Sequence, residues 1–169
     1  MNDKLALILM ILVTIIIIIS GIFIVNSTSP SVPSINSSSN AIAYTMDPTS
    51  FDWGSIDYDA DIATKEFKIK NKGSDILKLY NIKTSCHCTK AQIVVDGDES
   101  PFFGMSGIYS WVGEVKPGKE ARLIVKFDQR YHGPQGVGPI NRFVSIETND
   151  KGNQKITFTL TGIVVKKWK

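Results

Sequence analysis

The pattern of hydrophobic and polar positions begins with a long apolar segment. No charged residue occurs from Leu5 to Val25, and Ile15 to Ile19 is an unbroken run of isoleucine. As a helix rising about 1.5 Å per residue, this segment spans roughly 30 Å, the hydrocarbon thickness of a bilayer. A cleavable signal peptide is the alternative, but its apolar core would be only about 7–15 residues long, followed closely by a small-x-small site. The one Ala-x-Ala sequence, Ala41 to Ala43, lies far downstream, so the pattern favours an uncleaved transmembrane anchor over residues 5–25.

The charges beside this segment predict its orientation. Lys4 and the α-amino group precede it, partly offset by Asp3, and no charge follows until Asp47. Lysines and arginines close to a transmembrane helix stay in the cytoplasm. We therefore expect a single-pass protein of the cell membrane, with residues 1–4 as a cytoplasmic stub and the remaining chain on the extracytoplasmic side.

The next segment, residues 26–40, has a different composition. It holds seven serines together with Pro30 and Pro33, and it carries no charge. Such a composition buries too little apolar surface to offset the chain entropy lost on folding. We expect a disordered linker that separates the anchor from a domain beginning near Ala41.

After the linker, polar and apolar positions alternate with a period of two, as in strands with one buried face. Lys65 to Lys70 and Arg122 to Phe127 show the alternation most clearly. Turn clusters such as Asn71 to Asp75 and Lys116 to Lys119 separate the alternating segments. The predicted strands are residues 51–56, 65–70, 76–84, 92–95, 122–127, 142–148 and 155–165. About seven short strands at this spacing predict an all-β fold, an immunoglobulin-like β-sandwich over residues 41–169.

Composition and charge exclude several classes of function. The 19 Lys and Arg and 16 Asp and Glu residues are interleaved and give a net charge of +3, unlike the one-sided basic surface of a nucleic-acid-binding protein. Only two histidines are available for acid–base catalysis. The segment Gly104 to Gly107 is not a Gly-x-Ser-x-Gly elbow, and Gly133 to Pro139 lacks the Lys-Ser/Thr ending of a phosphate loop. We therefore expect a protein that is not an enzyme.

Short motifs in the predicted strands and turns stand in a recognisable order. They are Phe51 to Ile56, Phe67 to Gly73, Ser85 to Thr89, Val115 to Lys119, Val125 to Asp128, Glu147 to Asp150 and Leu160 to Gly162. The series resembles the bacterial domain-of-unknown-function family 1573, which is similar in fold to Hydin-type immunoglobulin-like domains. The resemblance covers nearly all of residues 47–165. It implies an immunoglobulin-like sandwich, often exported or membrane-anchored, and no established activity.

Two cysteines are the main candidates for a functional site. Cys86 and Cys88 are two positions apart, so in an extended strand their side chains point to the same face. In that geometry their Cα atoms would be about 6.5–7 Å apart, at the upper limit for a disulfide, and a local bend would be needed to close the bond. Outside the cytoplasm, such a pair of cysteines can be buried as small apolar side chains, form a disulfide, or bind a metal ion. The sequence leaves these alternatives open.

A metal site is one of the hypotheses. Two convergent thiolates suit Cu(I), and the thioether of Met105 and the imidazole of His132, both in glycine-punctuated loops, are compatible ligands. No cofactor is certain, and Cu(I) is the candidate. By analogy, copper-delivery proteins of cytochrome oxidase combine one N-terminal helix, an immunoglobulin-like domain and a Cys-x-Cys pair.

Two functions of different class follow. The first is a non-catalytic binding or scaffolding module of the cell envelope, for which the aromatic residues Phe102, Phe103, Tyr109 and Trp111 offer a predicted interface with a protein partner. The alternative is a copper-binding or metalloprotein-assembly factor that uses Cys86 and Cys88. A thiol oxidoreductase ranks third, because such enzymes rely on Cys-x-x-Cys at a helix N-terminus.

Overall fold

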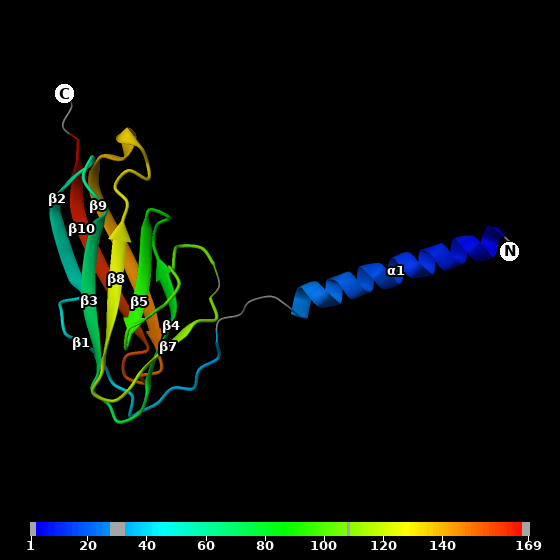
Figure 1. The fold of residues 1–169 in the computed structure, drawn as a ribbon, viewed down its shortest axis with the longest axis horizontal. Helices are drawn as coiled ribbons and strands as arrows, with labels where there is room; N and C mark the ends of the chain where they lie inside the picture. The colour runs from blue at the N-terminus through cyan, green and yellow to red at the C-terminus, as the bar shows by residue number, and fades with distance from the viewer. Residues whose placement is uncertain (1–2, 28–32, 108, 167–169) are drawn as a thin grey trace. The chain divides into compact units, whose positions relative to one another are not determined.

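The computed structural model describes residues 3–27, 33–107 and 109–166 (Figure 1). The chain divides into two compact units, residues 1–31 and residues 32–169. The first unit holds a helix and the second holds a β-domain, and each is described by itself below.

The helix α1 (Asp3–Ser27) is 25 residues long and ends two residues beyond the predicted segment. Its hydroxyl groups are satisfied within the helix: Thr14 donates to the carbonyl of Ile11 at 2.8 Å and Ser20 to that of Ile17 at 3.0 Å. By length and composition, Asp3–Phe23 is the one helical segment in the described ranges able to cross a membrane. This is compatible with a membrane anchor or a signal sequence.

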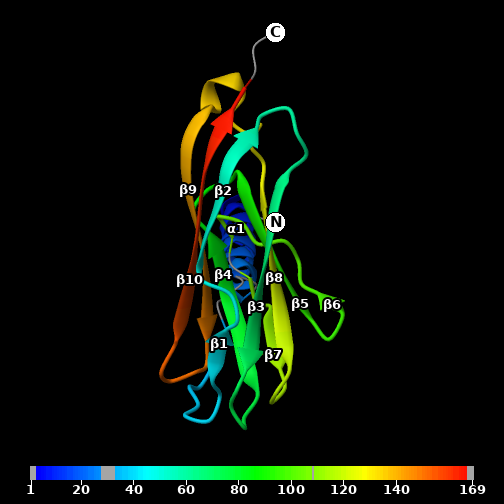
Figure 2. The same ribbon diagram turned by 90° about the vertical axis from the view of Figure 1, so that its left-hand side faces the viewer.

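The described part of the second unit folds into ten strands. They are β1 (Ala43–Thr45), β2 (Ser50–Asp57), β3 (Ala63–Asn71), β4 (Leu77–Thr84), β5 (Thr89–Val95), β6 (Asp98–Glu99), β7 (Val112–Val115), β8 (Glu120–Phe127), β9 (Gly138–Thr148) and β10 (Lys155–Val165), with a short 3-10 helix, η1 (Pro134–Gly136), before β9. One sheet has the order β1-β3-β8-β5-β6 and the other β2-β10-β9-β4-β7. Figure 2 shows the two sheets from the side. The predicted all-β, immunoglobulin-like sandwich is confirmed.

The strands that the alternation predicted are the seven longest ones. The three that it missed, β1, β6 and β7, are two to four residues long. A period of two cannot be recognised over so few positions. These short strands extend the sheets at their edges without changing the architecture.

The core lies between the sheets and follows from the alternation. In β8, Ala121, Leu123, Val125 and Phe127 all point inward and are buried, while the residues between them are more exposed. Across the core, strands of opposite sheets meet, and the rings of Phe67 in β3 and Phe158 in β10 lie 4.6 Å apart between centroids.

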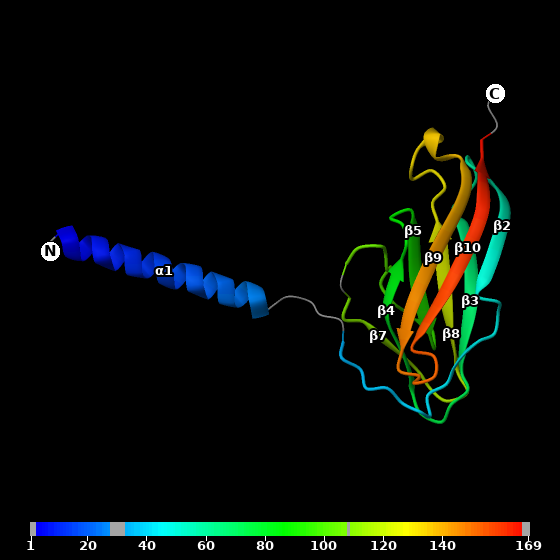
Figure 3. The same cartoon turned by 180° about the vertical axis from the view of Figure 1, so that it is seen from behind.

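The chain enters the sandwich at the end where β9 turns into β10, which we name the hairpin end (residues 149–154; Figure 3). Ser38 pairs with Asp150 as an isolated bridge, and Asp150 Oδ2 accepts a hydrogen bond from the amide of Ala43 at 2.9 Å. The predicted linker, residues 26–40, thus includes the last two residues of α1 and a segment attached to the domain. Its residues 28–32 lie outside the described residues.

Candidate functional site

Cys86 and Cys88 lie in the connection from β4 to β5, which crosses from one sheet to the other. The backbone turns there, because the buried hydroxyl of Thr84 bonds to the carbonyls of Cys86 at 3.0 Å and Thr89 at 3.1 Å, and the Thr89 amide donates to the Cys86 carbonyl at 3.1 Å. The turn brings the two cysteine Cα atoms to 5.2 Å, within the range for a disulfide. The two sulfurs are bonded in the structure.

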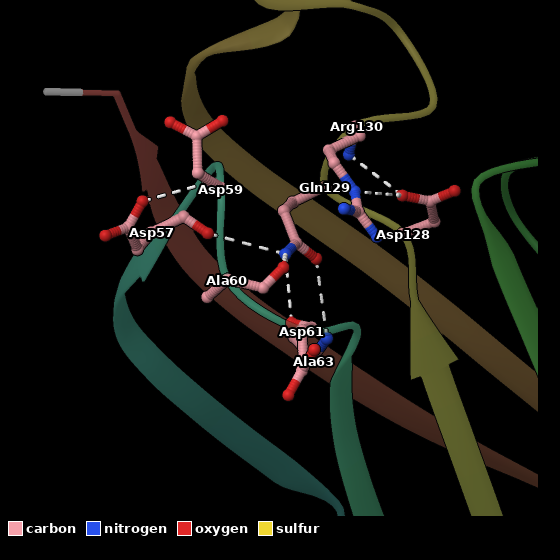
Figure 4. Close-up of polar contacts among 8 residues, drawn as sticks. All are labelled: Asp57, Asp59, Ala60, Asp61, Ala63, Asp128, Gln129 and Arg130. Carbon is pink, nitrogen blue, oxygen red and sulfur yellow. Dashed lines mark hydrogen bonds and ion pairs between the residues drawn. The ribbon is translucent and has the colours of Figure 1, made fainter. Parts of the chain in front are cut away.

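Three segments lie at the end of the sandwich opposite the hairpin end, which we name the disulfide end (Figure 1). They are the β4–β5 connection, the β8–β9 loop (128–137) and the β2–β3 turn (58–62). The buried side chain of Gln129 holds two of these segments together. Its Nε2 donates to the carbonyls of Ala60 at 2.8 Å and Asp61 at 3.0 Å, and its Oε1 accepts from the Ala63 amide at 3.4 Å (Figure 4). The conformation of the β8–β9 loop near Gln129 is therefore fixed by the preceding β2–β3 turn.

The two sulfurs have unequal surroundings. Cys88 is 2% exposed and packs in a buried cluster with Phe127 and Ile140, whereas Cys86 is half-buried. The guanidinium Nε of Arg142, on β9, donates to Cys88 Sγ at 3.2 Å, and the guanidinium lies 5.5 Å over the Phe127 ring. Burial lowers the pKa of Arg142 below its ordinary value, yet an arginine remains charged in proteins at neutral pH.

Cys86 Sγ has two different neighbours. The Cys88 amide donates to it at 3.1 Å, and His132 Nε2, from the β8–β9 loop, lies 3.7 Å away. The ligand atoms of Cys86, Cys88 and His132 all lie within 4.8 Å of one another. The structure therefore brings together three of the four residues predicted as metal ligands.

The fourth, Met105, is 49% exposed in the loop between β6 and β7. No hydrogen bond or ring contact among the described residues joins it to the sulfurs. His87, between the cysteines, is exposed and points toward a neighbouring pocket. The candidate metal ligands in this structure are therefore Cys86, Cys88 and His132.

That pocket has a volume of about 360 Å³ and lies at the disulfide end. Its wall is mostly apolar and includes three exposed side chains, namely Ile62 (43%), Phe102 (46%) and Tyr131 (53%), and the buried Cys88 also contributes to the lining. Ile62, Phe102 and Tyr131 come from three separate loops, and Gln129 joins the two loops that hold Ile62 and Tyr131. Lys126 lies at the rim, with its Nζ 4.9 Å from the Phe102 ring centroid.

The predicted aromatic interface needs a correction. Phe103 is fully buried, pairs with Ala91 of β5 as an isolated bridge, and contacts the rings of Tyr109 at 5.0 Å and Trp111 at 5.5 Å. Tyr109 and Trp111 are themselves partly buried against the core. The prediction of a contact surface is wrong for Phe103, because the loop folds back on the sheet and closes the core, and only Phe102 lies in the pocket wall.

Sequence reasoning missed Arg142, Tyr131 and Ile62. Arg142 is 54 positions from Cys88 and reaches it through the pairing of β4 with β9. No local pattern marks it, because it stands in a strand as one polar position among alternating residues. Tyr131 had a weak signal, since it adjoins His132 in the predicted loop.

Residues 44–97 match the family described as "Protein of unknown function (DUF1573)". The predicted resemblance to the DUF1573 family is confirmed over this segment. This segment includes β2 to β5 and therefore both cysteines of the disulfide. No curated protein matches this chain.

A solved structure shares the fold of this chain. A protein of unknown function from Porphyromonas gingivalis W83 is 20% identical, with a TM-score of 0.55 over 78% of this chain and 50% of that one. The chain thus spans about half the length of that protein. It is also similar to a PapD-like domain of human CEP192, at 13% identity and a TM-score of 0.48 over 83% of this chain and 97% of that one. At this identity the likeness to the Porphyromonas protein shows a shared fold only.

Proposed function

We propose that this protein is a membrane-tethered, non-catalytic binding module that presents the disulfide end of its sandwich to a protein partner in the cell envelope. One observation carries the proposal: the exposed apolar pocket beside the disulfide lies at the end opposite the one where the chain enters. A pocket so placed stays open to a partner when the hairpin end is attached to the linker.

The chemistry of the pocket supports a protein as its occupant. Ile62, Phe102 and Tyr131 together expose apolar surface, and such clusters on a domain mark interaction sites. The ammonium of Lys126 beside Phe102 suits an apolar side chain with a nearby carboxylate. We therefore expect the partner to insert an apolar side chain flanked by an acidic residue.

Photo-crosslinking in the cells that produce the protein tests the proposal. A photoreactive amino acid at Tyr131 is expected to give a discrete crosslinked product. The matched control places it at Ile163, which is also apolar and is 51% exposed on β10, outside the pocket. The product should fall at least about tenfold with Phe102→Ala, as for a residue central to an interface, and stay unchanged with Phe143→Ala, a phenylalanine of similar exposure on β9. Equal crosslinking at Tyr131 and Ile163 would contradict the proposal.

A second candidate function, Cu(I) binding, is favoured by the three ligand atoms within 4.8 Å. Thiolates and an imidazole suit Cu(I), and the sulfurs become available to the ion only after the disulfide is reduced. Anaerobic titration of the reduced full chain, in detergent and against a chromophoric Cu(I) chelator, tests it. Binding should be lost in the Cys86→Ser/Cys88→Ser variant, weaken in His132→Ala, and stay unchanged in Met105→Leu. Equal affinity of the wild type and the double variant would exclude this function.

A further inference from the structure

The disulfide is asymmetric in a way that matters for its reduction. A thiolate that breaks a disulfide attacks one sulfur along the S–S axis and expels the other as a thiolate. The rate depends on access to the attacked sulfur and on the stability of the leaving thiolate. In this structure the two properties are divided between the two cysteines.

Access favours Cys86. Cys86 is half-buried, and its sulfur lies beside the exposed side chain of His132 in the β8–β9 loop. Cys88 is 2% exposed, enclosed by the apolar cluster around Phe127. Cys88 contributes to the pocket lining, but its small exposed fraction leaves Cys86 as the more accessible cysteine for an incoming thiolate.

Stabilisation of the leaving thiolate favours Cys88. Its Sγ accepts a hydrogen bond from the charged Arg142 at 3.2 Å. Cys86 Sγ also accepts one, from the Cys88 amide at 3.1 Å, but that donor is neutral. Hydrogen bonds from a charged donor are about twice as strong as neutral ones. Buried apolar surroundings on the other sides of Cys88 strengthen the attraction between the guanidinium and a thiolate further.

We propose that the Cys86–Cys88 disulfide is a reducible two-electron centre of fixed polarity, in which a dithiol attacks Cys86 and Cys88 departs as the thiolate beside Arg142. In the first step the dithiol loses one thiol proton, its sulfur bonds to Cys86 Sγ, and the Cys86–Cys88 bond breaks with the electron pair passing to Cys88. In the second step the other sulfur of the dithiol, also deprotonated, attacks its partner sulfur in the mixed disulfide and releases Cys86. The dithiol ends as a disulfide, and the two electrons and two protons reside on Cys86 and Cys88.

This proposal goes beyond the binding function and does not depend on it. Copper binding requires the reduction, whereas the reduction requires neither copper nor the pocket. Loss of crosslinking at Tyr131 would therefore leave it intact, and failure of the tests below would leave the binding function intact.

The polarity can be measured on the unmodified full chain in detergent. Sulfite splits a disulfide into an S-sulfonate on the attacked sulfur and a thiolate on the other, so a short pulse of sulfite followed by N-ethylmaleimide labels the two cysteines differently. Trypsin cleavage after Lys83 and Lys90 gives one peptide, residues 84–90, that holds both. Sulfite is an anion that Arg142 attracts toward Cys88, which makes it a stringent probe.

We expect the sulfonate on Cys86 and the maleimide on Cys88 to exceed the reverse pattern by about tenfold or more, as a charge-assisted hydrogen bond supports. Equal labelling, or a preference for the sulfonate on Cys88, would overturn the proposal.

A second measurement isolates the part played by Arg142 in stabilising the departing Cys88 thiolate. Arg142→Gln keeps a hydrogen-bond donor and removes the charge, so reduction by dithiothreitol should slow about threefold to tenfold, and Arg142→Lys should recover part of the rate. The matched control is Arg122→Gln on β8, an exposed arginine paired with Glu66 at 3.1 Å, whose reduction rate should equal that of the wild type. Thermal unfolding of each variant checks that the sandwich is intact. A rate for folded Arg142→Gln equal to that of the wild type would overturn the assigned role, and the sulfite mapping tests the polarity even if this variant does not fold.

Discussion

At the scale of single residues, neighbours in this domain have opposite roles. Phe102 is 46% exposed in the pocket wall, while Phe103 is fully buried against Tyr109 and Trp111. The cysteines show the same contrast, since Cys86 is half-buried and Cys88 is enclosed. Burial therefore changes over one or two positions within each of these two loops.

The two phenylalanines make a matched pair for a stability measurement. Phe103→Ala should lower the free energy of unfolding by about 3–5 kcal/mol, because it leaves a cavity in a packed core. Phe102→Ala should change it by less than about 1 kcal/mol, since the ring is half in solvent. Denaturant unfolding of the full chain in detergent, followed by tryptophan fluorescence, gives both values. Similar losses for both variants would contradict the assignment of Phe103 to the core.

A buried amide gives the second residue-scale prediction. Asn71 is fully buried, and its Nδ2 donates to the carbonyls of Asp75 at 2.7 Å and Val115 at 2.8 Å. Asn71→Asp replaces both donors with an acceptor, so we expect a loss of about 2–4 kcal/mol in unfolding free energy. Asn141→Asp, at an exposed position, is the control and should be near neutral. Equal denaturation midpoints for the two variants would refute this account.

At the same scale, the sequence identified only part of the candidate site. Cys86, Cys88 and His132 were predictable because their side chains have distinctive chemistry. Arg142 was not, since its contact with Cys88 depends on how β4 and β9 pair and on a turn that only the folded backbone reveals. Phe103 was assigned to the surface because a loop aromatic has the same local sequence whether it turns inward or outward.

At the scale of elements, the edge strand β1 and the segment before it depend on Asp150 in the β9–β10 turn. Its two carboxylate oxygens accept from the amides of Ala43 at 2.9 Å and Gly152 at 2.8 Å, and Ser38 pairs with the same residue. Gly73 completes the contact, because a Cβ there would lie 1.9 Å from the Asn40 carbonyl oxygen. These residues hold the chain where it joins the sandwich.

Asp150→Ala should therefore loosen β1 more than the core. We expect a loss of about 1–3 kcal/mol in unfolding free energy, as for unsatisfied buried amides, and faster hydrogen exchange at residues 38–45. Exchange in β8, at the centre of its sheet, should change less. The control is Asp59→Ala in the exposed β2–β3 turn. Uniform acceleration across both strands would show that Asp150 acts on the whole domain instead.

The elements also show where periodicity succeeds and fails. The long strands were predictable because each has one face in a two-layer core, and burial of that face imposes a period of two. The hydrogen bonds that attach Ser38 were not, because its neighbours are serines and asparagine without an apolar pattern. Pairing there rests on backbone hydrogen bonds and on the Ser38 hydroxyl, which donates to Asp75 Oδ2 at 2.6 Å.

At the scale of the whole molecule, the proposed topology can be tested directly. In a Cys86→Ser/Cys88→Ser background, we expect Lys151→Cys, in the exposed β9–β10 turn, to react with a membrane-impermeant maleimide in intact cells. Asn2→Cys, in the predicted cytoplasmic stub, should react only after lysis. The reverse pattern would invert the topology, and equal labelling of both before lysis would contradict a single span.

The pairing of β2 with β10 has a consequence for the order of events in biogenesis. Phe51 lies opposite Leu160 in a parallel pair, although nearly the whole domain separates them in the sequence. Such non-local pairing is slow to form, because the intervening chain must first be ordered. The sandwich therefore closes only after its last strand has been synthesised. The bond between Cys86 and Cys88 spans two positions and needs no such wait, so oxidation can precede folding, and Arg142 reaches the sulfur only when the final strands assemble.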